Sequence, residues 1–225
     1  MKELILSIPA TVLFILCLSF QASAWCPTAV LSGTSEEAVV CTEIYSDNFG
    51  DNDVLNIAQN VLRPWVGWYF TPTADMDVCK IDVWIDGIVN VLGASHEYYV
   101  EIWSLSGGNL DTKLGQSSKL EGSLFSANTY ISANAGFAEF SSSVPLTGST
   151  KYAIVMILGS DATPGDSPPE VDADNYPRVG YDNENDGSGE DSDGAQGGWV
   201  AFDTGKGAQE TDAEDDVRME IWSDQ

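Results

Sequence analysis

Three tryptophans in the 225-residue chain each follow an acidic residue at a spacing of two, within runs rich in β-forming residues. Side chains alternate between the two faces of a strand, so each acidic residue and its tryptophan would project from the same face. Indole rings pack against the C–H faces of sugars, and carboxylates accept hydrogen bonds from sugar hydroxyls. If the three strands are neighbours, the pattern predicts a ligand platform formed by Asp82, Trp84, Glu101, Trp103, Glu220 and Trp222.

Two other interpretations of these tryptophans stay open at this stage. A strand tryptophan is often packed under a loop or against a second sheet, and a flanking carboxylate often only keeps an edge soluble. The same residues could also form a contact surface for another protein. The run "WVGWYF" adds Trp65 and Trp68, which face opposite sides of one strand, so at least one of them is predicted to be a core residue.

An acidic stretch from Asp182 to Asp193 has the spacing of a calcium-binding loop. Oxygen ligands occupy positions 1, 3, 5, 7, 9 and 12, and a glycine stands at position 6, where such loops turn sharply. The predicted Ca²⁺ ligands are Asp182, Glu184, Asp186, Ser188 through its carbonyl, Glu190 and Asp193. The flanking runs "RVGY" and "WVAF" are predicted strands, whereas helices usually flank a loop of this kind. The alternative is therefore an acidic loop that joins a pair of strands and binds no metal.

Catalytic residues are not predicted. The chain has one histidine, His96, no G-x-S-x-G nucleophile motif and no glycine-rich phosphate loop. Two carboxylates at a defined separation suffice for glycoside hydrolysis, but any acidic chain offers such pairs. We therefore expect a non-enzymatic protein, with an acidic-site glycan hydrolase or lyase as an alternative.

The charge balance excludes some partners. Nine Lys and Arg stand against 35 Asp and Glu, which gives a net charge of -26. Such a field repels nucleic acid and anionic membranes. It fits a protein that stays soluble in a salty medium, or one that binds Ca²⁺.

The elements that must position these residues are strands. Helical periodicity is almost absent, and β-rich runs alternate with clusters of turn residues, which is typical of an all-β sandwich or barrel. The run 152–158 is apolar on both sides and is predicted to be a central strand. The predicted strands are eight: 65–70, 79–85, 97–105, 136–140, 151–158, 178–181, 199–202 and 217–222.

The order of these segments resembles a known family. From "WYFTPTADMDVCKIDVWI" through "YYVEIWSLSGGNLDTKLGQSSKL" and "FAEFSSSVPLTGSTKYAIVMIL" to "VRMEIW", residues Val61 to Trp222 resemble the choice-of-anchor type of secreted jelly-roll domain. These domains are similar to galactose-binding-like and carbohydrate-binding β-sandwiches. The resemblance implies a two-sheet jelly roll of about eight strands, with the long acidic loop between the last strands. In sandwiches of this type Ca²⁺ often joins an early loop to the last strand, so Asp47, Asp51 and Asp53 could meet carboxylates near Asp215 and Asp216.

The first residues have the pattern of a signal peptide. An apolar run from Leu4 to Phe20 precedes "QASA", which predicts cleavage after Ala24 and a secreted protein. No later run approaches the about 20 apolar residues that span a bilayer, so membrane insertion is not expected. We expect one domain overall, with residues 25–60 as an N-terminal segment packed on the sandwich and 61–225 as the jelly-roll domain.

Three cysteines remain after this cleavage, so one disulfide is expected in an oxidising compartment. Cys26 with Cys41 is the first prediction, because 14 residues between them make a short loop. Cys41 with Cys79 is the alternative, since that bond would hold the N-terminal segment against the first clear strand.

Together these features predict a secreted, calcium-stabilised binding module that recognises an extracellular glycan or a similar surface polymer. The alternative is a structural subunit of a surface layer or extracellular filament, in which copies of the chain form a homo-oligomer or larger assembly.

Overall fold

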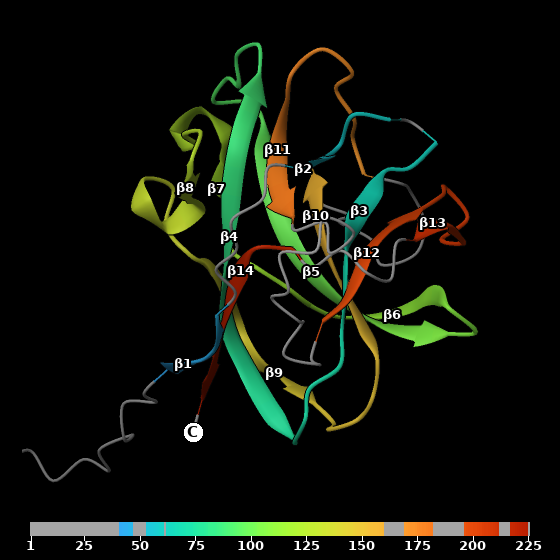
Figure 1. The fold of residues 1–225 in the computed structure, drawn as a ribbon. Coiled ribbons are helices and arrows are strands. Elements are labelled where there is room, and N and C mark those ends of the chain that lie inside the picture. Colours follow the sequence, from blue (N-terminus) through green and yellow to red (C-terminus); the bar gives the residue numbers. More distant parts are fainter. Residues whose placement is uncertain are drawn as a thin grey trace, which may run out of the picture. The chain divides into compact units, whose positions relative to one another are not determined.

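A computed structural model describes residues 41–46, 53–60, 62–159, 169–181, 196–211 and 217–224, which belong to one compact unit, Val39–Gln225. The described residues form fourteen strands and two short 3₁₀ turns, without an α-helix (Figure 1). The strands make two seven-stranded sheets whose pairings are all antiparallel. The prediction of an all-β, two-sheet sandwich is confirmed.

The first sheet is organised around one long strand, β4 (Met76–Val89). Along one edge, β4 pairs first with β14 and then with β11; along the other edge, it pairs with β9 and then with β8. β1 and β2 extend this sheet beyond β14 and β11. The bounds are β1 (Cys41–Ser46), β2 (Asp53–Asn56), β8 (Thr129–Tyr130), β9 (Ala138–Leu146), β11 (Tyr176–Tyr181) and β14 (Met219–Asp224).

The second sheet has the order β13-β12-β3-β10-β5-β6, and β7 also pairs with β5. Its central strand β10 is the predicted one, and all of its side chains are buried because each face of the strand is covered. The bounds are β3 (Trp65–Phe70), β5 (Glu97–Ser106), β6 (Asn109–Gln116), β7 (Leu120–Glu121), β10 (Tyr152–Leu158), β12 (Gln196–Phe202) and β13 (Ala208–Thr211).

The main core lies between the two sheets. Ile81, Val83 and Ile85 of β4 point into it with no exposed surface, as their alternation with polar residues predicts. Trp68 also belongs to this core, whereas Trp65 points away from it to the other side of β3. At least one of these two tryptophans was expected in the core, and the structure confirms it.

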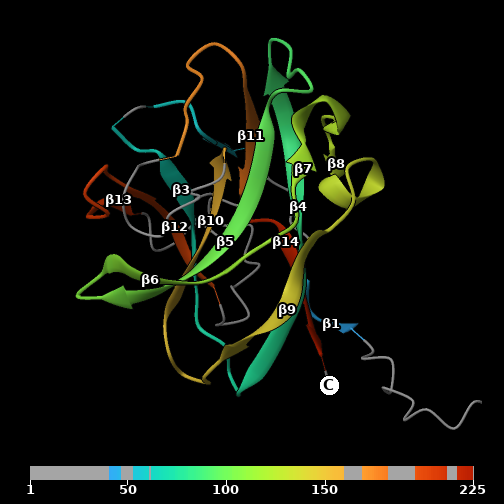
Figure 2. The ribbon, with the colours of Figure 1, turned by 180° about the vertical axis from the view of Figure 1, so that it is seen from behind.

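The second sheet also encloses a smaller apolar cluster on its outer side. β6 and β13 stand at opposite ends of the strand order, yet their hairpins meet, because Leu110 N donates to Lys206 O at 3.0 Å and Ala208 N to Asn109 Oδ1 at 3.3 Å. Both hairpins project on the same side of the molecule (Figures 1 and 2). The sheet therefore curls, and its concave side holds Trp65, Tyr69, Trp103, Leu110, Ala153, Val155, Ile157, Val200 and Phe202.

The acidic stretch after β11 does not join a strand pair. β11 lies in the first sheet beside β4, and β12 lies in the second sheet beside β3. The expectation of a hairpin-like loop is therefore corrected: the stretch connects the two sheets. Residues 182–195 themselves lie outside the described part of the chain.

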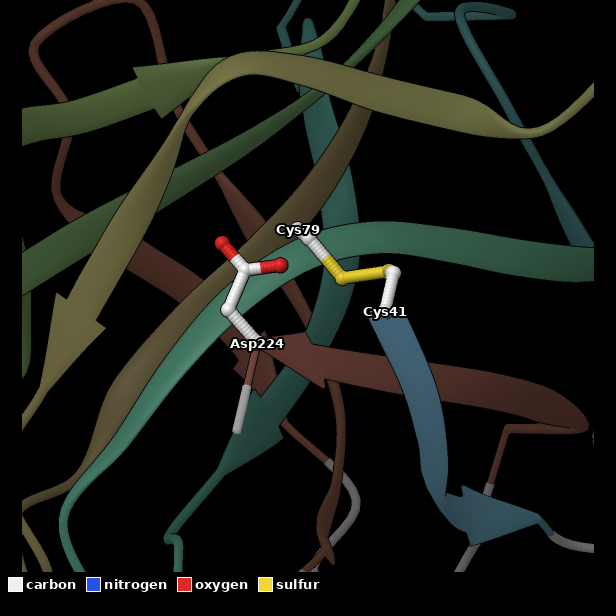
Figure 3. A group of neighbouring side chains, drawn as sticks. All are labelled: Cys41, Cys79 and Asp224. Carbon is white, nitrogen blue, oxygen red and sulfur yellow. A yellow bond between two sulfur atoms is a disulfide. The ribbon is translucent and has the colours of Figure 1, made fainter. Parts of the chain in front are cut away.

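The disulfide joins Cys41 of β1 to Cys79 of β4, with the Cα atoms 6.3 Å apart (Figure 3). The predicted bond between Cys26 and Cys41 is therefore wrong, and the alternative is correct. Cys79 lies at a β-bulge of β4. The pairing with β9 on one edge passes from Val78 to Lys80, and the pairing with β14 on the other edge shifts at the same place. The entropic cost of closing a loop rises only slowly with the length of the loop. The pairing of the strands, and not the sequence separation of the cysteines, therefore decides which two cysteines form the disulfide.

The segment before the predicted domain contributes directly to the first sheet. β1 and β2 come from residues 25–60, the segment that was expected to pack on the sandwich. The predicted signal peptide, residues 1–24, and Cys26 lie outside the described residues. Among the described residues, no helix has the length and apolar character needed to cross a bilayer.

Candidate functional site

The structure brings together two of the three predicted acid–tryptophan pairs. β4 and β14 are neighbours, and Glu220 lies directly opposite Asp82. β5 belongs to the other sheet, where Glu101 and Trp103 are only 0% and 1% exposed. The predicted three-strand platform is therefore corrected to a two-strand one.

The outer face of the first sheet carries the two remaining pairs. Met219 and Ile221 of β14 point into the core, so Glu220 and Trp222 project to the opposite side. The backbone beside Trp84 is a junction, because β14 and β11 meet there along the same edge of β4. Trp84 N donates to Arg218 O, and Arg218 N donates to Gly180 O, both at 3.1 Å.

The first group on this face is the Trp84 cluster, formed by Trp84, Tyr130 and Arg218. The guanidinium carbon of Arg218 lies 3.6 Å from the centre of the Trp84 ring. Tyr130 meets the same indole edge-on, with ring centres 5.2 Å apart. All three side chains are half-buried, and burial raises the pKa of the Tyr130 phenol.

The second group is the Trp222 cluster, formed by Trp222, Phe137 and Lys80. Lys80 Nζ lies 4.0 Å from the Trp222 ring centre and 3.9 Å from that of Phe137. The two rings meet edge-on at 5.7 Å. Each such cation–π contact contributes about 0.5–1 kcal/mol at a partly exposed site, so both indoles are held in defined orientations.

Between the two clusters lie carboxylates with different roles. Asp82 is 1% exposed, and its Oδ1 accepts hydrogen bonds from Ser132 N at 3.0 Å and Val83 N at 3.1 Å. Burial raises the pKa of Asp82, although these bonds oppose that rise. Asp82 therefore fixes the turn between β8 and β9 against β4, and it is not available to a ligand.

Glu220 is the acid of this face that lies between the two clusters and keeps part of its surface exposed. It is half-buried, and Glu43 of β1 lies opposite its neighbour Trp222. Burial first, and then the carboxylates of Glu43 and Asp82, raise the pKa of Glu220. The face thus offers carboxylate acceptors and guanidinium and ammonium donors beside partly exposed aromatic rings.

Glu101 and Trp103 form a buried network instead. Trp103 Nε1 donates to Glu101 Oε2, and Lys113 Nζ contacts Glu101 Oε1, both at 2.8 Å. The same spacing of acid and tryptophan therefore serves packing in one sheet and an exposed face in the other.

His96 is committed to loop structure at the start of β5. Its Nδ1 accepts a hydrogen bond from Gly93 N at 2.8 Å, so the proton of the neutral ring lies on Nε2, which faces Asp172 Oδ2 at 3.0 Å. Both ring nitrogens are thus occupied in holding two loops together. Hydrogen bonds from His96 and from the segment after Asp172 lower the pKa of Asp172.

The predicted calcium ligands, and also Asp47, Asp51, Asp215 and Asp216, lie outside the described residues. The described ends of these acidic stretches are close in the first sheet, since Ser46 lies opposite Glu220 and Asp53 lies opposite Tyr181.

One group within the described residues has the ligand spacing of a metal site: Cys41, Cys79 and Asp224, with ligand atoms within 4.8 Å of one another (Figure 3). Both sulfurs are joined in the disulfide, so neither can act as a thiolate ligand. This group therefore does not offer a metal centre.

Sequence reasoning missed five residues of the outer face. Arg218 and Lys80 could have been found, because each stands two positions from an acidic residue of the pattern on the same strand. Tyr130 and Glu43 come from other strands, Phe137 comes from the segment just before β9, and no local signal places them here. The five are Glu43, Lys80, Tyr130, Phe137 and Arg218.

No protein-family model, curated protein or solved structure matches the chain.

Proposed function

We propose that the protein is a secreted, non-catalytic binding module whose ligand is an extracellular glycan or a similar hydroxyl-rich polymer. The observation that carries this proposal is the row of half-exposed aromatic and charged side chains on the outer face of the first sheet. The outer side of the second sheet, by contrast, carries a buried apolar cluster. The ligand would lie along β4 and β14, between the Trp84 and Trp222 clusters.

Each component of this face suits a carbohydrate. Aromatic rings offer flat apolar area, while Arg218, Lys80 and Glu220 offer donors and acceptors for hydroxyl groups. The rings are already oriented by cations and by edge-on neighbours, so little side-chain entropy would be lost on binding. The disulfide supports export, because such bonds persist in oxidising compartments.

Binding is tested by titrating soluble β-glucan, xylan, mannan, pectin and chitin oligomers while following tryptophan fluorescence and heat. We expect at least one polymer to bind, and Trp84→Ala and Trp222→Ala each to weaken that binding about tenfold, or about 1.4 kcal/mol. Tyr99→Ala is the matched control, because Tyr99 is a half-buried aromatic residue of the second sheet. A panel without binding, or equal losses in all three variants, contradicts the proposal.

We also propose that Ca²⁺ stabilises the module through the acidic stretch 182–193. The support is the ligand spacing in the sequence and the large negative charge of -26. Bound Ca²⁺ would reduce repulsion among these carboxylates.

A further inference from the structure

A buried lysine on the curled second sheet lies against both a carboxylate and a carboxamide. Lys113 Nζ is 2.8 Å from Glu101 Oε1 and 2.8 Å from Gln116 Oε1. Glu101 has no exposed surface, and the side chain of Lys113 is 9% exposed. The proposed binding face uses none of these residues.

The local backbone explains why the three side chains converge. Glu101 lies opposite Gln116, and Trp103 lies opposite Lys113, with a shift of register between these pairs. This irregularity puts Lys113 and Gln116, three positions apart in β6, on the same side of the strand. The Trp103 indole then holds Glu101 in place through its second oxygen, at 2.8 Å.

We propose that Lys113 and Gln116 become covalently joined by an isopeptide bond after folding, with Glu101 as the proton relay. A buried ion pair is costly, and transfer of a proton from Lys113 to Glu101 yields a neutral amine and a neutral acid. The free amine is a nucleophile, which the ammonium form is not.

The step balances without any further reagent. The amine nitrogen of Lys113 attacks Cδ of Gln116, and the bond from Cδ to the amide nitrogen breaks. Glu101 passes the proton it took from Lys113 to the leaving nitrogen, which departs as ammonia, and Glu101 takes up the second proton of the amine, so that it ends the step protonated. Since Nζ already contacts the amide oxygen, its distance to the bonded carbon is on the order of 3–4 Å, close to the separation of reacting atoms.

A second lysine–glutamate pair offers a natural comparison. Lys119 Nζ also lies 2.8 Å from Glu97 Oε1, but the side chains are 50% and 42% exposed. Water keeps this pair charged, so its amine stays protonated and unreactive. The bond is expected at the buried pair and not at the exposed one.

The test is the intact mass of the folded, full-length secreted chain after reduction of its disulfide. We expect the protein to be lighter than its sequence by one ammonia, and trypsin to leave the chain uncut after Lys113. Lys113→Arg restores the calculated mass, and so does Glu101→Gln. Lys119→Arg keeps the deficit.

Each other outcome overturns the proposal. A wild-type chain of unmodified mass shows that the pair is only an ion pair. A deficit of one water instead would mean that Lys113 joins Glu101. A deficit that peptide sequencing places outside residues 81–119 would belong to another modification. If Glu101→Gln does not fold, wild-type chain obtained from insoluble inclusion bodies and dissolved in urea should have the calculated mass before folding and lose one ammonia only after it folds; a deficit already present before folding overturns the proposal.

Discussion

Asp172 and Asp82 show how two buried or hydrogen-bonded carboxyls in one protein respond to pH in opposite ways. Hydrogen bonds from His96 and the chain after Asp172 lower the pKa of Asp172, whereas burial raises the pKa of Asp82. A lowered pKa adds stability at pH values above the ordinary carboxyl range, and that stability is lost as pH falls. A raised pKa has the reverse effect, because the protonated acid is the better tolerated form.

The Asp172 contribution can be isolated by the substitution Asp172→Asn. In wild type, the free energy of unfolding should decrease as pH falls below the ordinary value of 3.8, because the folded state resists protonation of Asp172. The variant should be less stable at pH 6 and should lose less stability between pH 4 and about 2. Urea unfolding at a series of pH values measures this. Parallel pH profiles for the two proteins would contradict the assigned role.

At the scale of elements, β3 packs so closely against β10 that it tolerates no side chain at one position. A Cβ on Gly67 would lie 1.9 Å from the carbonyl oxygen of Ile154 and 2.6 Å from the Cα of Val155. Backbone atoms cannot move aside as a flexible side chain can, so the centre of the second sheet depends on this glycine.

Gly67→Ala should therefore cost about 3 kcal/mol or more of unfolding free energy, or prevent folding. Gly87→Ala is the matched control, since Gly87 is also a strand glycine and its Cβ would meet only Arg178 Cδ at 3.7 Å. Chemical denaturation of both variants provides the comparison. Similar stability of the two variants would show that β3 and β10 are less closely packed than described.

The position of a strand in the sequence was easier to predict than the strands with which it pairs. Apolar alternation in Ile81, Val83 and Ile85 correctly marks β4 as half-buried. Short strands such as β8 lack such a pattern, and they form because β4 offers an edge. Sheet membership also has no local signal, which is why Glu101 and Glu220 look equivalent in sequence but occupy different environments.

At the scale of the whole molecule, negative charge is the dominant property. A net charge of -26 opposes compaction, and cations that bind the folded state offset this repulsion. The proposal of a calcium-stabilised module belongs to this scale, because the predicted ligands belong to the segment that follows β11 of the first sheet and precedes β12 of the second.

Ca²⁺ should raise the melting temperature more than NaCl of equal ionic strength does. Ligand at a hundredfold excess over its Kd stabilises the folded state by about 2.7 kcal/mol. The double variant Asp182→Asn and Asp186→Asn should lose this response, while Asp111→Asn, in an exposed position of β6, should keep it. Scanning calorimetry makes the measurement. An identical melting curve in both salts would remove the calcium proposal.

The bond between Cys41 and Cys79 also determines how the domain bears mechanical load. A pull on the chain before Cys41 would otherwise peel β1 from β14 one hydrogen bond at a time, the weakest way to load a sheet edge. With the bond in place, tension passes directly to β4, the strand that both halves of the first sheet share. The reduced protein should therefore yield at the edge, and the oxidised protein should resist until β4 itself is drawn out.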